Sequence, residues 1–215
     1  MPVAGREVEI PLEDITLHGA LELPPGATGI VAFVHGSGSS RHSPRNQMVA
    51  RQLREGGLGT LLFDLLSAEE ERVDAVTRHL RFDIALLARR LVAVTDWLVE
   101  SQRVDLPVGY FGSSTGAAAA LIAETRTPHE IYAIVSRGGR PDLAGDALRV
   151  VRAATLLIVG GEDPQVLALN CEASELLCCE KALYVVPGAT HLFQEPGALE
   201  AVAEAARGWF VEHLP

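Results

Sequence analysis

Short, continuous runs of apolar residues recur through this chain, and each run is followed by a stretch with helical spacing. A run of about five apolar residues without polar alternation is typical of a strand buried on both faces, as in parallel sheets. Strands that alternate with helices form a mostly parallel sheet covered by helices on both sides. The chain is therefore predicted to be an α/β protein, a three-layer α/β/α sandwich. The expected buried strands are residues 29–34, 58–66, 108–110, 131–135, 155–159 and 182–186.

The first part of the chain departs from this pattern. Residues 8–10 and 15–23 alternate apolar and polar side chains, which indicates an antiparallel pair at one edge of the sheet. With 215 residues, no internal repeat and no long linker, the chain fits a single domain, residues 1–215. Hydrophobic residues make up 48% of the chain and charged residues 21%, so an ordinary globular core is expected.

The formal net charge is -10 at pH 7, and no cluster of lysine or arginine forms a basic stripe. This charge distribution argues against nucleic acid and against an anionic membrane surface as partners. The N-terminus is too polar for a signal peptide, and no apolar run approaches the ~18 residues of a membrane span. We expect a cytoplasmic protein, and the sequence leaves open whether it forms a homodimer.

Three cysteines, Cys171, Cys178 and Cys179, fall in one stretch that is predicted to be helical. Their odd number, the absence of C-x-x-C spacing and the absence of nearby histidines argue against both a disulfide framework and a zinc site. We expect them to be small apolar helix residues in a reducing compartment, and a reactive thiol is the alternative.

The apolar run that starts at Val108 ends in a Gly-x-Ser-x-Gly motif, with Ser114 at its centre, and continues as an alanine-rich helix. In a nucleophile elbow, a strand turns sharply into a helix and holds the central serine in strained geometry with its hydroxyl exposed. Gly112 and Gly116 would leave room where strand and helix pass closest. A chance match in a loop is the alternative, but the predicted strand and helix on either side are the context that the motif requires.

Ligands of open parallel sheets bind at the carboxyl ends of the strands, and two polar residues follow strands there. Asp163 comes four residues after one buried strand, and His191 comes five residues after the next. A serine nucleophile needs a base and a group that orients the base, and the order Ser114, Asp163, His191 is the one this type of fold uses. The alternatives are a solvated loop histidine, a helix N-cap role for Asp163, and Glu162 as the orienting acid.

The backbone amides of Ser37 and Thr115 are the predicted oxyanion hole. Thr115 follows the predicted nucleophile, and Ser37 lies in the loop His35-Gly36-Ser37-Gly38, after a buried strand. Each such donor lowers the barrier of acyl transfer by about 2.7 to 4 kcal/mol. A glycine-serine loop before a helix could bind phosphate instead, but this one lacks the Walker lysine and the G-x-G-x-x-G pattern.

Three arginines, Arg45, Arg137 and Arg140, lie on predicted loops at the same end of the sheet. They are candidates for binding a carboxylate or phosphate of the substrate, and the alternative is that they are solvated or paired with surface acids. Residues 67–81 are charged and have no strand period. We expect this segment to be an exposed excursion that leads into a helix over residues 82–100.

Four segments together resemble the α/β-hydrolase superfamily: His35-Gly36-Ser37-Gly38, Gly112-x-Ser114-x-Gly116, Gly160-x-x-Asp163 and Gly188-Ala-Thr-His191. The similarity extends from about residue 15 to the end of the chain. The short length and the stretch His-Gly-Ser-Gly-Ser-Ser-Arg-His-Ser-Pro-Arg, which begins at His35, resemble the dienelactone-hydrolase-like group of small bacterial hydrolases.

The resemblance implies an eight-stranded sheet, neither cofactor nor metal, and an acyl-enzyme on Ser114 with Asp163 and His191 in a catalytic triad. The implied substrate is a small molecule with an ester-type bond, such as a carboxylic ester, a thioester or a lactone. Dienelactone hydrolases proper use a cysteine nucleophile, so Ser114 argues against dienelactone itself as the substrate. Many α/β hydrolases insert a lid after the sixth strand, but residues 136–154 hold at most one short helix, and no substantial lid is expected.

Two alternative functions remain open at this stage. A protein with the hydrolase fold can bind a small ligand or a protein without turnover, because fold does not determine function. Transfer of an acyl group to an acceptor other than water would use the same triad as hydrolysis.

Overall fold

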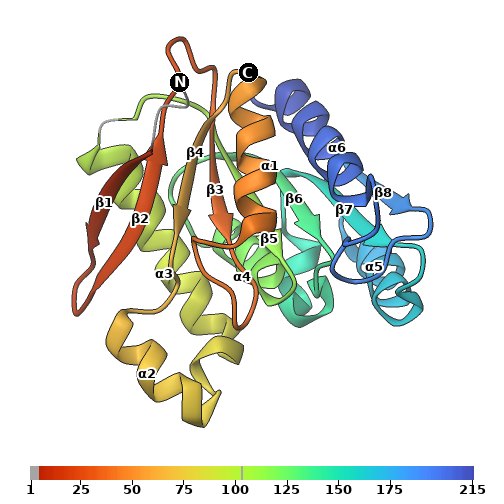
Figure 1. Cartoon of the computed structure of the whole chain (residues 1–215), viewed down its shortest axis with the longest axis horizontal. Helices are drawn as coiled ribbons and strands as arrows, with labels where there is room; N and C mark the ends of the chain where they lie inside the picture. Colours follow the sequence, from red (N-terminus) through yellow and green to blue (C-terminus); the bar gives the residue numbers. More distant parts are fainter. Residues whose placement is uncertain (1–4, 103) are drawn as a thin grey trace.

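The computed structural model describes residues 5–102 and 104–215 of the chain. One sheet of eight strands has the order β1-β2-β4-β3-β5-β6-β7-β8 (Figure 1). The two pairings that involve β2 are antiparallel, and all others are parallel. The strands are β1 (Arg6–Pro11), β2 (Thr16–Glu22), β3 (Ile30–Val34), β4 (Gly59–Phe63), β5 (Val108–Ser113), β6 (Ile131–Arg137), β7 (Ala154–Gly160) and β8 (Lys181–Val186).

Helices cover both faces of this sheet, as Figure 1 shows. The helices α1 (Pro44–Glu55) and α6 (Ala198–His213) pack on one face, where Leu53 and Phe210 join strand side chains in one core cluster. The other face has a second cluster, which includes Leu91 and Ala119. It is covered by α3 (Ile84–Asp96), α4 (Thr115–Glu124) and α5 (Pro164–Leu176). The predictions of an α/β fold, three layers and an eight-stranded, mostly parallel sheet are confirmed.

The central strands are buried on both faces, which explains why their sequences show no alternation. Every residue of β3 and β5 is buried. Along β5, Phe111 stacks at 4.9 Å between ring centroids against Phe33 on the α1 side of the sheet. Tyr110 points to the opposite side, where its hydroxyl bonds the hydroxyl of Thr95 at 2.7 Å. The antiparallel edge pair predicted from residues 8–10 and 15–23 is also present, as β1 and β2.

The charged segment between β4 and α3 is more ordered than its sequence indicated. It contains the helix α2 (Ala68–Thr77), which starts with a capping box between Ser67 and Glu70. The short 3₁₀ helix η1 (Leu80–Phe82) follows. The prediction of an exposed excursion is wrong at Asp74, which is buried and pairs with Arg81. Polar contacts rather than an apolar stripe hold this segment in place. The hydrophobic periodicity of the sequence therefore did not predict helix α2.

Between β6 and β7, the chain forms only the 3₁₀ segment η3 (Pro141–Arg149), which is kinked at Gly145. The expected absence of a substantial lid is therefore confirmed. In Figure 1, α2 lies near the carboxyl ends of β3 and β4. The predicted helix at residues 82–100 starts at Ile84 and ends at Asp96, and the π-helical turn η2 (Trp97–Ser101) extends it.

One prediction about the cysteines is wrong. Helix α5 ends at Leu176, because the chain becomes extended at Leu177 on its way to β8, so only Cys171 lies in a helix. Cys171 and Cys178 are exposed and Cys179 is half-buried, and therefore they are not apolar residues of one helix. In the part of the chain that the structure describes, no helix is both long and apolar enough to cross a membrane.

Candidate active site

Ser114 occupies a strained turn between β5 and α4. Its backbone has φ 49 and ψ -121, a positive φ that non-glycine residues seldom adopt. Gly116 is required because a Cβ there would lie 2.1 Å from the carbonyl oxygen of Val34, and a Cβ at Gly112 would lie 2.5 Å from the Cα of Ala117. Ser114 is partly exposed, and its hydroxyl does not cap helix α4. The turn has the geometry that the nucleophile-elbow prediction required.

Asp163 and His191 come together at the ends of β7 and β8. The distance between His191 Nδ1 and Asp163 Oδ2 is 2.7 Å. The two loops meet because Gly160 lies so close to the β8 loop that a Cβ would be 2.3 Å from the Ala189 carbonyl oxygen. Asp163 precedes α5, but its carboxylate bonds His191 and does not cap the helix. Glu162, the alternative acid, is exposed.

The end of β6 connects the serine and the histidine. The amide of Ser114 donates a hydrogen bond to the carbonyl oxygen of Arg137 at 3.3 Å. The next residue, Gly138, has φ +51, and a Cβ there would lie 3.5 Å from Cε1 of His191. Ser114 and the ring of His191 thus adjoin two consecutive residues, Arg137 and Gly138. With Nδ1 directed at Asp163, the other ring nitrogen of His191 is available as a base.

The two predicted oxyanion donors, Ser37 and Thr115, are in contact. Thr115 is the first residue of α4, so its amide has no partner within the helix. The amide of Ser37 donates to Thr115 Oγ1 at 3.1 Å. A Cβ at Gly36 would lie 3.0 Å from the Cβ of Ser114, which places this loop directly beside the serine. The hydroxyl of Thr115 is a contact that the sequence pattern did not reveal.

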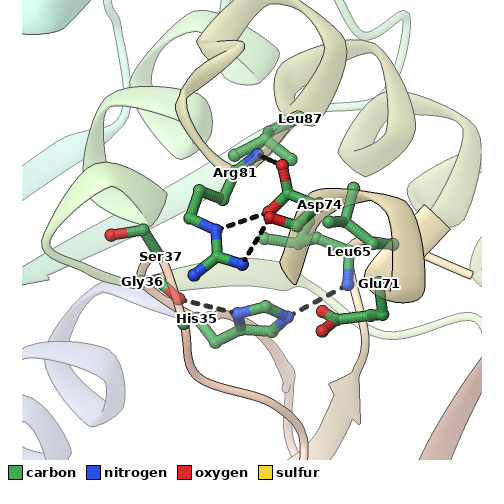
Figure 2. Close-up of a pocket in the computed structure, with 10 residues that line it drawn as sticks. His35, Gly36, Ser37, Leu65, Glu71, Asp74, Arg81 and Leu87 are labelled. Carbon is green, nitrogen blue, oxygen red and sulfur yellow. Dashed lines mark hydrogen bonds and ion pairs between the residues drawn. The ribbon is translucent and has the colours of Figure 1, made fainter. Parts of the chain in front are cut away.

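His35 shares this end of the sheet, but it has a structural role. Its Nδ1–H donates to the carbonyl of Gly36 at 2.9 Å, and its Nε2 accepts from the amide of Leu65 at 3.1 Å (Figure 2). Burial lowers the pKa of His35, with the Gly36 carbonyl and the charge of Asp64 opposing this effect. Both ring nitrogens are occupied, so His35 cannot serve as the base for Ser114.

The three candidate arginines differ in their surroundings. Arg140 makes two hydrogen bonds to Asp142, at 2.8 and 2.7 Å. Arg137 is buried, and its guanidinium carbon lies 5.8 Å from the centroid of the Phe111 ring. Desolvation, together with repulsion from Arg45, lowers the pKa of Arg137 to about 10. Thus Arg140 is neutralised by an acid, whereas Arg45 and Arg137 are close to each other.

An open groove of about 550 Å³ lies beside the glycine-serine loop and the start of α1. Arg45 lines the groove, and so does Arg81, which the sequence analysis did not single out as a site residue. Figure 2 shows that Arg81 extends from the segment after α2 to pair with Asp74, close to Ser37. Within residues 5–102 and 104–215, no cluster of three or more histidine, cysteine, aspartate or glutamate side chains could hold a metal ion.

Known proteins share both the sequence and the fold. The crystal structure of a dienelactone hydrolase from Anabaena variabilis is 55% identical, with a TM-score of 0.96 over 99% of this chain and 100% of that chain. An α/β serine hydrolase without a lid from Xanthomonas campestris superposes with a TM-score of 0.74 at 22% identity, over 100% of this chain and 97% of that one. No protein-family model matches the chain.

Two curated proteins from strains of Mycobacterium tuberculosis are 54% identical over 214 residues, and their names assign them provisionally to the phosphoribosyl transferases. The match covers 99% of this chain but 47% of each relative, so the chain spans about half the length of these relatives. The chain belongs to the dienelactone-hydrolase-like group of the α/β-hydrolase superfamily. It has the fold of the α/β-hydrolase enzymes.

Proposed function

We propose that this protein is a serine hydrolase that cleaves an ester-type bond through an acyl-enzyme on Ser114. The observation that carries the proposal is the 2.7 Å contact of His191 Nδ1 with Asp163, made beside a serine in strained elbow geometry. Nucleophile, base and orienting acid each follow a different strand, as the triad chemistry of this fold requires.

In the proposed reaction, Nε2 of His191 takes the proton of the Ser114 hydroxyl while the serine oxygen attacks the substrate carbonyl. Asp163 holds the imidazole in the Nδ1–H tautomer and stabilises its protonated form. The amide of Thr115 stabilises the negative charge of the tetrahedral intermediate, and the amide of Ser37 joins it by exchanging its bond to Thr115 Oγ1 for one to the substrate oxygen. His191 then protonates the leaving group, and a water molecule that is activated in the same way releases the acid.

The proposed substrate is a small carboxylic ester, thioester or lactone, and the open groove beside Ser37 supports access without a lid. The Anabaena variabilis relative is named a dienelactone hydrolase, which supports hydrolysis of an ester-type bond but does not identify the substrate of this chain. The sequence predicts a cytoplasmic protein without a nucleic-acid partner, and both statements stay predictions. Whether the chain forms a homodimer was left open by the sequence.

The test combines labelling with turnover. Purified protein is expected to cleave short-chain aryl esters and to be labelled by a fluorophosphonate at Ser114. The variant Ser114→Ala should lose both. The hydroxyl of the neighbouring Ser113 bonds Asn46 at 3.4 Å, and the control variant Ser113→Ala should still be labelled. Equal labelling of wild type and Ser114→Ala, or of neither, would reject the proposal.

Two variations of this function need their own experiments. Acyl transfer predicts that added alcohols appear in new ester products, and hydrolysis predicts that the free acid dominates. A binding protein without turnover predicts that Ser114→Ala keeps full function in the cell.

Phosphoribosyl transfer is a second candidate function, because the curated relatives are 54% identical to this chain. Their names describe whole proteins, of which this chain matches 47%. We propose that any such activity belongs to the part of the relatives that this chain does not match, since a serine elbow with a paired histidine and aspartate serves acyl chemistry. Incubation of the chain with a phosphoribosyl donor should therefore leave the donor unchanged, and consumption of the donor would contradict this assignment.

A further inference from the structure

Arg137 is a buried cation without a carboxylate partner. The residue is only 9% exposed. Its Nη1 is buried and has no hydrogen-bond partner among the residues that the structure describes. The ring of Phe111 lies 5.8 Å from the guanidinium carbon. Cation–π attraction is small beside the cost of burying an unpaired ion, so this contact does not account for the arginine.

Arg45 adds a second positive charge nearby. The residue after it, Asn46, accepts a hydrogen bond at 3.4 Å from the hydroxyl of Ser113, which is the register partner of Arg137. Arg45 lies in the first turn of α1, its Nε is buried without a partner in the described residues, and its repulsion contributes to the lowered pKa of Arg137. A helix N-terminus carries a partial positive charge and favours acidic side chains, but the first turn of α1 has none. Glu71 lines the same groove as Arg45, but no carboxylate of the described residues pairs with either arginine.

Within the described residues, the other buried or half-buried arginines, Arg207 apart, are each paired with a carboxylate, which makes the contrast with Arg45 and Arg137 informative. These ion pairs are Arg41–Asp64, Arg54–Glu22, Arg81–Asp74 and Arg90–Glu70. Arg140 has the same kind of partner, in Asp142. Within the described parts of the chain, no carboxylate lies within 4.0 Å of Arg45 or Arg137. Among the described residues, the two buried arginines are Arg90 and Arg137, and only Arg90 has a carboxylate partner.

The two unpaired arginines adjoin the proposed nucleophile. Arg137 pairs with Ser113 in the register of β5 and β6, and its carbonyl accepts the hydrogen bond from the amide of Ser114. Arg45 lines the open groove together with hydroxyl side chains of the glycine-serine loop, Ser39 and Ser40. Arg137 and Ser114 are not among the residues that line this groove. A negatively charged group that contacts both arginines would lie beside Ser114, because Arg137 adjoins it.

We propose that Arg45 and Arg137 bind a phosphate group carried by the substrate of this enzyme. This inference rests on the proposed hydrolase function and adds the class of substrate, a phosphorylated ester-type compound. A phosphate monoester has a charge of about -1.5 to -2 at pH 7, which balances two arginines, whereas a single carboxylate balances one. The guanidinium fork suits phosphate oxygens, and serine hydroxyls are additional donors.

The first experiment measures binding alone. Inorganic phosphate, phenyl phosphate and benzoate are titrated into the protein in a calorimeter, with wild type and the variants Arg137→Gln, Arg45→Gln and Arg140→Gln. Wild type should bind both phosphates at least tenfold more tightly than benzoate, and each of the first two substitutions should weaken phosphate binding at least tenfold. Arg140→Gln, which removes an arginine already paired with Asp142, should change the binding less than twofold.

Phosphate binding should persist in Ser114→Ala, which separates this inference from the hydrolase proposal. If esters are not cleaved but phosphate binds as stated, only the proposed function fails. Arg137→Met provides a check on folding: phosphate should raise the Tm of wild type but not the Tm of this variant. Benzoate binding as tight as phosphate binding, or phosphate binding that is unchanged in both Arg137→Gln and Arg45→Gln, would overturn the inference.

A kinetic arm distinguishes phosphate on the substrate from free phosphate. The 4-nitrophenyl ester of phosphonoacetic acid should have a kcat/KM at least tenfold above those of 4-nitrophenyl acetate and 4-nitrophenyl succinate. Arg137→Gln should remove this preference, so that its kcat/KM values for the three esters agree within threefold of one another. Equal kcat/KM values for the three esters, with phosphate bound only as the free ion, would show that the site does not select the substrate.

Discussion

The backbone amide of Ser37 donates a hydrogen bond to the hydroxyl of Thr115, with 3.1 Å between nitrogen and oxygen. The two residues are 78 positions apart in the sequence and come from the loops after β3 and β5. Both had been predicted as oxyanion donors through their amides alone. The hydroxyl of Thr115 holds the Ser37 loop against the start of α4, where the proposed oxyanion hole lies. Loss of this hydroxyl should therefore lower kcat.

Thr115→Val keeps the shape of the side chain and removes the acceptor for the Ser37 amide. We expect kcat for an aryl ester to fall about 10- to 100-fold with little change in KM, because loss of one oxyanion donor costs about 2.7 to 4 kcal/mol and a displaced donor costs somewhat less. Thr115→Ser retains the hydroxyl and should stay within threefold of wild type. Steady-state kinetics of the three proteins decide the matter, and a loss in Thr115→Ser as large as that in Thr115→Val would contradict a specific role of the hydroxyl.

Asp163 and Glu162 are adjacent acids, but only the first is placed against His191, at 2.7 Å. Asp163→Asn should lower kcat by about 10⁴-fold, because the amide stabilises the wrong tautomer of the imidazole and cannot stabilise its charge. Glu162→Gln, at an exposed position, should remain within twofold. The measurement is the hydrolysis rate of an aryl ester at pH 7.5, and a loss in Glu162→Gln comparable to that in Asp163→Asn would reassign the orienting acid.

The central sheet could be predicted because burial on both faces leaves a direct trace in the sequence. The runs in β3 and β5 carry no polar alternation, and Gly112 and Gly116 identify a turn where a Cβ would meet backbone atoms. The pairing of Asp163 with His191 follows from topology, since the carboxyl ends of β7 and β8 are neighbours. The positions of Asp163 and His191 after neighbouring strands were thus sufficient to predict that the two residues meet.

Polar anchoring could not be predicted in the same way. Asp74 lies in a charged stretch, and nothing in its sequence neighbourhood indicates that Arg81, seven residues later, will cover it. The partners of the arginines were equally hidden, because Arg137, predicted on a loop but found as the last residue of β6, is three residues from Arg140, and only Arg140 has an acid. Whether a charged side chain forms an ion pair depends on which other side chains the folded chain brings near it, and the local sequence does not show this.

Gly116 tests the packing of the elbow apart from its chemistry. A Cβ at this position would lie 2.1 Å from the Val34 carbonyl oxygen, which belongs to a buried strand and cannot move cheaply. Gly116→Ala should lower the free energy of unfolding by about 3 kcal/mol or more. Gly208→Ala, in helix α6 with nothing within 4 Å of the added Cβ, should raise it by about 0.5 to 1 kcal/mol. Urea unfolding measures both, and a Gly116→Ala protein as stable as wild type would contradict the close approach of α4 and β3.

His35 should make the stability of the protein depend on pH below neutrality. Burial lowers its pKa in the folded state below the ordinary value of 6.5, and Leu65 donates a hydrogen bond to the neutral ring. Above pH 6.5 both folded and unfolded chains carry the neutral imidazole, so the full contribution to stability is present. As the pH falls below 6.5, the imidazole binds a proton in the unfolded chain before it does so in the folded chain. The free energy of unfolding then decreases by at most about 1.4 kcal/mol per pH unit.

The variant His35→Gln isolates this effect. Glutamine can donate to the Gly36 carbonyl and accept from the Leu65 amide, but it does not titrate. We expect a lower free energy of unfolding than wild type at pH 7.5 and a smaller loss between pH 7.5 and 5.5, measured by urea denaturation. Burial raises the pKa of Glu71 and of Glu124, which favours the folded state as the pH falls and so opposes His35. Because both carboxyls titrate in wild type and variant alike, the difference between the two slopes belongs to His35, and identical slopes would mean that the buried ring accepts a proton in the folded protein.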